Sequence, residues 1–292
     1  MPSGSNTARK FCHITLLRKP DSFCCPATGL LNSPRRRREK DYDNAIADFT
    51  EAIRLDPKYA MVYKDRGDAW SNKKDYDNAI ADYTEAIRLD PKYVIAYFSR
   101  ANAWGAKKDN DKAIADYTEA IRLDPKFVSA YNNRGDRWFV KKKYGKAMSD
   151  FDAALQINPK HGYAICSKAE TFAKLKKYDE ATEHFDKALK LNSSAGITQL
   201  YSFFRATCPD AKYRDGKKAV EMANLAIERS GKAAKWVYFR TLAAAYAEVG
   251  DFELAVTEQR KVLDDKRIDA TDKKEQEARL ALYRAKKPYR DE

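Results

Sequence analysis

Glycine, proline and cysteine are scarce in this chain, and long apolar runs are missing. Of the 292 residues only 11 are Gly and 10 are Pro, which suits a nearly all-helical protein. The five cysteines are odd in number and three precede residue 40. They form no disulfide framework and favour a reducing compartment. Without about 18 consecutive apolar residues or a standard secretory signal, we expect a cytoplasmic protein with no membrane span.

Motifs for catalysis or metal binding are also missing. The sequence contains no GxxxxGK[ST], GxGxxG, GxSxG or HExxH pattern. His161 and His184 have no cysteine or acidic partner at metal-ligand spacing. The many carboxylates follow a repeat and do not converge. We therefore expect no enzymatic activity, no cofactor, no metal and no small-molecule substrate.

The basic charge is concentrated at one end. The formal net charge is +13, and residues 1–40 contribute +7 of it. This segment has no helical period, contains the run Arg35-Arg36-Arg37-Arg38, and is predicted to be a disordered leader. The run is either a solvated charged tail or a nuclear or nucleic-acid signal. The remaining body is nearly charge-balanced, which argues against nucleic-acid binding by the body.

One segment recurs throughout the first half of the chain. Residues 75–93 read DYDNAIADYTEAIRLDPKY, and close copies occupy residues 41–59 and 109–127, with a looser copy at 143–160. The spacing is 34 residues each time. A fixed period of this size predicts a solenoid of stacked helices.

The sequence pattern of each unit predicts two helices. In residues 60–89, the apolar positions of the first half have helical spacing, and Lys73-Lys74 then form a turn. Asp75 is suited to cap the second helix, which ends at Asp90 before Pro91. We expect the small residue Gly67 to lie where the two antiparallel helices approach, and Trp70 to fill the space between helices.

These positions resemble the tetratricopeptide repeat (TPR) over about residues 41–264. The matching residues of three units are Tyr63, Arg66, Gly67, Trp70, Ala79, Tyr83, Ala86 and Pro91; Tyr97, Arg100, Ala101, Trp104, Ala113, Tyr117, Ala120 and Pro125; and Tyr131, Arg134, Gly135, Trp138, Ala147, Phe151, Ala154 and Pro159. The part from Cys208 onward is similar to some bacterial TPR proteins. The resemblance implies an all-α, right-handed superhelical solenoid of antiparallel helix pairs.

The family's usual leucine before the small residue is replaced by arginine or lysine, and aspartates also recur at 34 residues. Arg66 is placed to pair with either Asp48 or Asp82, and the same pairing would repeat along the stack. The alternative is a set of exposed charges that contribute little.

The sequence divides into four regions. We predict the basic leader at 1–40, a regular TPR array of a half repeat plus four repeats at 41–193, two divergent helix pairs at 194–264, and a capping helix and tail at 265–292. The helix expected from Asp41 lacks its first helix and would expose Ile46, Phe49 and Ile53. Residues 1–40, another chain, or an unusual start would account for this.

One face of the first helices varies while the packing positions repeat. In TPR stacks the first helices line a concave groove that holds peptides or helices of partner proteins, so the resemblance implies a non-catalytic scaffold. Association with nucleic acid or an anionic surface through the leader is the alternative. The Lys and Arg residues of the chaperone-tail clamp are mostly absent, and we expect a polar or basic peptide instead. The predicted groove residues are Lys64, Asp68, Phe98, Asn102, Asn132, Asp136, Tyr163 and Glu170.

Overall fold

A computed structural model describes residues 34–231 and 235–291 of the chain. Within these ranges the secondary structure is helical, without a β-strand. The α-helices are α2 (Pro34–Leu55), α3 (Ala60–Asn72), α4 (Tyr76–Leu89), α5 (Val94–Ala106), α6 (Asn110–Leu123), α7 (Val128–Val140), α8 (Tyr144–Ile157), α9 (Gly162–Lys174), α10 (Tyr178–Leu191), α11 (Ala195–Thr207), α12 (Gly216–Ser230), α13 (Trp236–Glu248), α14 (Phe252–Leu263) and α15 (Ala270–Arg284). Among the described residues, none of these helices is long and apolar enough to cross a membrane.

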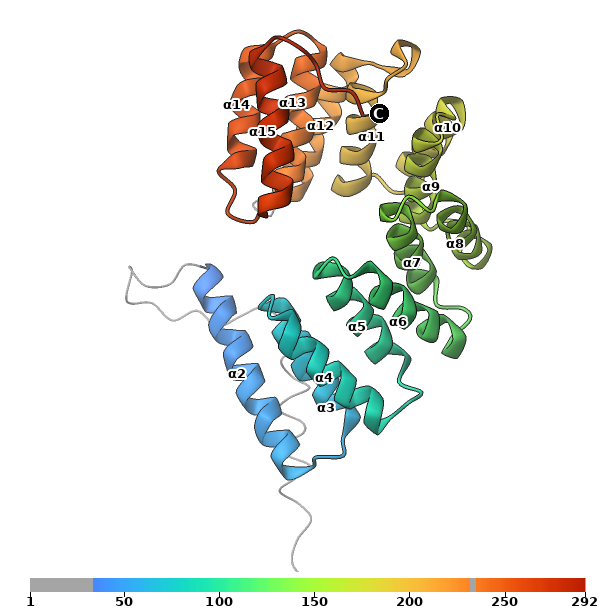
Figure 1. Ribbon diagram of the computed structural model, residues 1–292, viewed down its shortest axis with the longest axis vertical. Helices are drawn as coiled ribbons and strands as arrows, with labels where there is room; N and C mark the ends of the chain where they lie inside the picture. Colours follow the sequence, from blue (N-terminus) through green and yellow to red (C-terminus); the bar gives the residue numbers. More distant parts are fainter. Residues whose placement is uncertain (1–33, 232–234, 292) are drawn as a thin grey trace, which may run out of the picture.

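Consecutive helices form pairs, and each pair packs on the next. The pairs are α3/α4, α5/α6, α7/α8, α9/α10, α11/α12 and α13/α14, with α15 packed on α14. The stack curves into an open arc, with α2 to α6 in one arm and α11 to α15 in the other (Figure 1). Helices α7 and α9 lie on the inner side of the arc, and α8 and α10 lie outside them. The predicted all-α solenoid is confirmed.

The small residues mark the closest approach of two helices in a pair. A Cβ atom added to Gly67 would lie 2.6 Å from the Tyr83 ring, and one added to Gly135 would lie 2.5 Å from the Phe151 ring. Each glycine therefore lets an aromatic side chain of the second helix enter the pair. Trp70 packs, half-buried, against the core of the first pair, as predicted.

The predicted ladder of arginines is present, and its partner is now identified. Arg66 donates through Nε and Nη2 to both carboxylate oxygens of Asp82, at 2.8 and 2.7 Å. Asp82 lies in the same unit, so the pairing with Asp48 is wrong. Arg66 Nη1 also donates to Thr50 of the preceding helix, at 3.1 Å. One guanidinium thus joins three helices, and the same contacts recur for Arg100 with Asp116 and Thr84, and for Arg134 with Asp150 and Thr118.

In the fourth unit the acidic partner lies on the preceding helix and not within the same unit. Lys168 replaces the arginine and pairs at 2.6 Å with Asp152, which stands where the earlier units have threonine. The position of the earlier aspartates is taken by His184. The ion pair therefore links two neighbouring units directly, because the carboxylate now lies on the preceding helix α8.

Helix ends follow the predicted caps with one correction. Asp75 accepts a hydrogen bond from the backbone N–H of Asn78 at 3.2 Å, as a cap does. Helix α2, however, begins at Pro34 and not at Asp41. Proline is tolerated in the first turn of a helix, and the arginines, glutamate and lysine that follow are good helix formers. The rest of the predicted leader, residues 1–33, lies outside the described residues.

The half repeat at the start of the array is better covered than expected. Ile46 is 9% exposed because α3 packs on α2, whereas Phe49 and Ile53 remain half-buried. The expectation that all three side chains would be exposed is therefore wrong for Ile46.

The second half keeps the helix-pair plan with an insertion. A short 3-10 helix, η2 (Ala211–Tyr213), lies in the loop between α11 and α12. Helix α15 buries Leu280 and Tyr283 at the end of the stack. After α15 the chain turns back, and the backbone N–H of Asp291 donates to the Thr207 carbonyl at 3.0 Å. The last described residues thus return to α11.

Candidate functional site

The inner side of the arc carries two cavities, and the first helices of the pairs supply most of their lining. One cavity lies between α5 and α7, and the other lies between α7, α9 and α11. All eight predicted groove residues lie on α3, α5, α7 or α9, and Phe98 packs against the hydrophobic core of its unit.

In the first unit the predicted residues are already paired. Lys64 Nζ lies 2.8 Å from Asp68 Oδ2, and it also contacts Asp65. Asp68 Oδ1 accepts a hydrogen bond of 2.8 Å from the Tyr83 hydroxyl. The charges of Lys64 and Asp68 therefore compensate each other within the unit, and the hydrogen bond from Tyr83 orients the Asp68 carboxylate.

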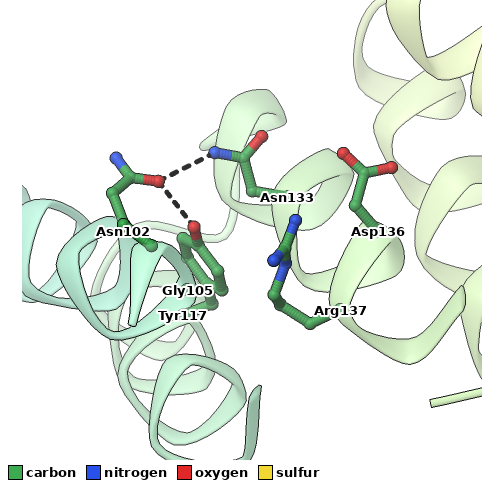
Figure 2. Close-up of a pocket in the computed structure, with 7 residues that line it drawn as sticks. Asn102, Gly105, Tyr117, Asn133, Asp136 and Arg137 are labelled. Atoms are coloured by element: carbon green, nitrogen blue, oxygen red, sulfur yellow. Dashed lines mark hydrogen bonds between the residues drawn. The ribbon is translucent and has the colours of Figure 1, made fainter. Parts of the chain in front are cut away.

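The second unit forms the larger cavity, of about 280 Å³. Asn102 Oδ1 accepts hydrogen bonds from the Tyr117 hydroxyl at 2.5 Å and from Asn133 Nδ2 at 3.1 Å (Figure 2). Gly105 leaves space where the other units have Ser71, Phe139 and Ala173. Figure 2 shows Asn102, Asn133, Asp136 and Arg137 around this space. The cavity therefore combines amide groups with one acid and one guanidinium.

Phe98 and Tyr163 have different environments although both were predicted to line the groove. The Phe98 ring lies 4.7 Å from Phe127 and 5.7 Å from Tyr117, between ring centroids, and belongs to the core of its unit. Tyr163 is 47% exposed, and its hydroxyl accepts from Ser194 at 3.3 Å. Tyr163 is thus available to a partner, whereas Phe98 mainly packs.

The third and fourth units lose a hydrogen-bond donor that the first two units have. Asp136 and Glu170 stand at the positions of Asp68 and Asn102, but Phe151 and Phe185 replace the tyrosines that donate there. Asp136 receives a 3.4 Å contact from Asn132 Nδ2. Glu170 has no hydrogen-bond donor among the described residues.

Partial burial shifts the pKa of both acids. Burial is the main cause that raises the pKa of Asp136 to about 6. Burial also raises the pKa of Glu170 to about 8, with further contributions from the negative charges of Asp136 and Asp291. Both carboxyls are half-buried and face a groove, so a donor or cation that entered the groove would stabilise their charged forms.

Asn132 adds another unfilled acceptor beside this pair. The residue is 7% exposed, and its Oδ1 atom has no hydrogen-bond partner in the described structure. Its Nδ2 atom makes only contacts of 3.4 Å, with Asn133 and Asp136. Asn132 Oδ1 and the Glu170 carboxyl therefore lack donors among the described residues, and Asp136 is hydrogen-bonded by Ser167 and only weakly contacted by Asn132.

The second cavity places Glu170 beside several aromatic rings. Phe139, Phe203 and Phe204 line it together with Glu170 and Lys174. On α13 the Arg240 guanidinium lies 4.7 Å from the centre of the Phe203 ring. Burial, followed by the charge of Arg279, lowers the pKa of Arg240 to about 10. The second cavity thus places an acid and a lysine beside aromatic rings, and Arg240 packs on one of those rings.

Sequence reasoning missed several of these residues. Gly105 was detectable, because it replaces a side chain at the 34-residue spacing. Arg137, Lys174 and Arg240 gave no such signal. Asp291 lies 117 residues from Lys174, yet the two pair at 3.0 Å. No local pattern predicts a contact of that range. Among the described residues, no group of three or more His, Cys, Asp or Glu side chains is placed to hold a metal ion.

Comparison with family models agrees with this geometry. Models described as TPR repeat or tetratricopeptide repeat match residues 37–59, 67–108, 105–137 and 162–194. The chain is a tetratricopeptide repeat protein. The matched residues include α4 to α6, parts of α3 and α7, and α9 to α10 of this TPR protein. A comparison with curated proteins gave no match.

Solved structures show the same fold. A tetratricopeptide repeat protein from Parabacteroides merdae is 18% identical, with 84% of this chain and 93% of that chain covered and a TM-score of 0.69. The APC/C hetero-tetramer Cut9-Hcn1 gives 15% identity, coverage of 83% and 47%, and a TM-score of 0.67. MamA gives 23% identity, coverage of 54% and 92%, and a TM-score of 0.50. These similarities support the TPR solenoid, and at such identities they show the fold alone.

Proposed function

We propose that this TPR protein is a non-catalytic protein-interaction scaffold that holds a polar or basic segment of a partner in the groove across α5, α7 and α9. The TPR family supports the scaffold role. The groove assignment is supported by its inner position, by its cavities, and by Asn132 Oδ1 and the Glu170 carboxyl, which have no donor among the described residues. We further expect the protein to act in the cytoplasm, on a protein and not on a small molecule.

The observation that carries the proposal is the change from tyrosine to phenylalanine between units. Tyr83 and Tyr117 satisfy Asp68 and Asn102, while Phe151 and Phe185 leave Asp136 and Glu170 without that donor. A buried carboxyl without a donor is costly. A lysine or arginine of a partner would remove that cost and form a charge-assisted hydrogen bond.

Asparagines beside the acids suit the backbone of the same segment. Asn102 uses its Oδ1 atom for two internal hydrogen bonds and is exposed. Its Nδ2 atom points away from these partners (Figure 2) and is a donor for a peptide carbonyl. Tyr163, exposed on α9, offers a ring against which an alkyl or guanidinium group can pack.

Charge reversal in the groove tests the proposal. Affinity capture from the native cell, with the wild type and with Asp136→Lys plus Glu170→Lys, is followed by mass spectrometry. We expect proteins captured by the wild type to be lost from the double variant. Glu183→Lys, a charge reversal of the same sign and half the total size at an exposed position of α10, is the control and should retain them. Equal recovery by all three proteins would contradict binding at the acids.

A further inference from the structure

The segment that follows α15, residues 287–291, crosses the second half of the stack. Figure 1 shows the chain leaving the end of α15 and running over neighbouring helices toward α11. We call residues 287–291 the return segment. Its last three residues, Tyr289, Arg290 and Asp291, each contact a different partner on the helices below.

Tyr289 covers a buried cation. Its ring centre lies 3.7 Å from the guanidinium carbon of Arg279, and 6.4 Å from the centre of the Phe203 ring. Arg279 is only 3% exposed, and its Nε and Nη1 atoms have no hydrogen-bond partner in the described structure. An aromatic ring is the group that stabilises such a cation without accepting a hydrogen bond from it.

Arg290 completes a charge pair on α13. Its Nη1 atom lies 2.7 Å from Glu248 Oε2. The other oxygen of Glu248 already accepts from Arg214 Nε at 2.8 Å. Arg214 in turn donates to the carbonyls of Cys208 and Pro209. Arg214, in the loop before α12, thus holds the Glu248 side chain in place. The second carboxylate oxygen of Glu248 is then available to Arg290 of the return segment.

Asp291 uses both backbone and side chain. Its N–H donates to the Thr207 carbonyl at 3.0 Å, and its carboxylate pairs with Lys174 at 3.0 Å. Thr207 is the last residue of α11, where helix carbonyls lack a partner within the helix. A main-chain hydrogen bond together with side-chain contacts in sequence is how grooves bind extended peptides.

The return segment is held by these polar contacts and by the Tyr289 ring, which packs against the hydrophobic cluster that includes Tyr283. The apolar anchors of the capping helix, Leu280 and Tyr283, belong to α15 itself. Asp291 also stands near Glu170, whose pKa its negative charge helps to raise. Lys174 is the point where the return segment meets the groove of α7 and α9.

We propose that α9, α11, α13 and α15 form a second peptide-binding site, specific for an extended Tyr-Arg-Asp sequence, which the return segment occupies as a displaceable ligand. An incoming segment with the same order of aromatic, basic and acidic side chains takes its place. The site adjoins the proposed partner groove at Lys174, but its contacts are Arg279, Glu248, Lys174 and the Thr207 carbonyl and do not include the carboxyls of Asp136 and Glu170.

The test uses the full chain and a defined peptide. The released variant has Tyr289→Ala, Arg290→Ala and Asp291→Ala, and the probe is a fluorescent peptide, AKKPYRDE, from residues 285–292. Fluorescence anisotropy should show binding to the released variant and at least tenfold weaker binding to the wild type. A peptide with Tyr, Arg and Asp in scrambled order should not bind.

Charge exchange locates the site. In the released variant, Lys174→Glu should weaken binding of the probe at least fivefold, and a probe with lysine in place of its aspartate should recover most of the loss. Absent binding, equal binding to wild type and released variant, or equal binding of the scrambled peptide would overturn the proposal. So would unfolding of the released variant, monitored by circular dichroism, because the segment would then be a structural cap. Partner capture through Asp136 and Glu170 succeeds or fails independently of these results.

Discussion

At the scale of the residue, one ring hydroxyl distinguishes the first two units from the next two. It supplies a hydrogen bond to the polar side chain on the first helix of the unit. Tyr83 donates to Asp68, whereas Phe151 stands beside Asp136 with no hydroxyl. Gly67 and Gly135 accommodate the two rings in the same way. The substitution is therefore compatible with the packing of the pair, and it changes the chemistry of the groove alone.

Restoring this hydroxyl gives the first prediction. Phe151→Tyr should supply Asp136 with a donor, lower its pKa from about 6 toward the ordinary value, and stabilise the fold by about 1 kcal/mol. NMR titration of Asp136 and urea denaturation measure the two effects. The same variant should weaken partner capture, and a carboxyl pKa that stays near 6 would show that the hydroxyl does not reach it.

Glu170 should make stability depend on pH. Its pKa of about 8 in the folded chain exceeds the ordinary value of 4.5, so the folded chain binds the proton more tightly than the unfolded chain. The resulting stabilisation is complete below about pH 4.5 and is lost as the pH rises toward 8. Glu170→Gln should therefore be more stable than the wild type at pH 8, by about 1–2 kcal/mol, and its stability should vary less with pH.

Thermal unfolding followed at several pH values between 5 and 9 measures this effect. Glu183→Gln serves as the control, because Glu183 is exposed on the outer helix α10. A parallel pH profile for Glu170→Gln and the wild type would contradict an uncharged, buried Glu170.

At the scale of the element, helix pairs depend on a close approach that the sequence marks with a small residue. Gly135→Ala would place a methyl group 2.5 Å from the Phe151 ring, whereas a Cβ at Gly145 meets nothing within 4 Å. We expect Gly135→Ala to destabilise the chain by about 2 kcal/mol through overpacking. Gly145→Ala should stabilise it by about 0.5–1 kcal/mol, because alanine favours the helix. Urea denaturation of both variants compares two equal chemical changes.

The arginine ladder is the second feature at this scale. Asp116 is 7% exposed and depends on two hydrogen bonds from Arg100. Arg100→Leu should therefore cost about 3 kcal/mol, since it leaves a buried carboxylate unpaired. The double variant with Asp116→Ala should recover at least half of this loss. A double-mutant cycle in urea measures the coupling, and additive effects would assign the pair no role in stability.

At the scale of the whole molecule, the curvature of the stack brings distant turns together. Lys108, in the turn after α5, lies 2.6 Å from Asp269 at the start of α15. The hydrogen bond from Lys108 is the first cause that lowers the pKa of Asp269 to about 2. The pair is largely exposed, so salt should weaken it.

Opening of the arc is the prediction that follows. Lys108→Glu should increase the radius of gyration measured by small-angle X-ray scattering, and raising the salt concentration should move the wild type in the same direction. Lys142→Glu, at the equivalent turn of the next pair, is the control and should leave the radius unchanged. Identical scattering of the three proteins at low salt would mean that the contact does not hold the arms together.

Much of the fold could be predicted because a solenoid is built from contacts between neighbours. The helix pairs, Gly67 against Tyr83 and the cap at Asp75 all lie within one unit, so the 34-residue period contains them. The choice between Asp48 and Asp82 could not be made, since both recur with the same period. The start of α2 was misplaced because Pro34 and the arginines have no apolar period. The predicted division into four regions and the groove residues remain predictions.

The sequence by itself determined the architecture. The apolar helix faces, the caps and the small residues all specify contacts between segments fewer than about 40 residues apart. Only the tertiary structure decided which groups meet across the arc, such as Lys108 with Asp269 and Lys174 with Asp291. Those contacts depend on small rotations between successive units, which add up along the stack. No single unit encodes the sum, so the charge state of Glu170 and the position of the return segment became visible only in the folded chain.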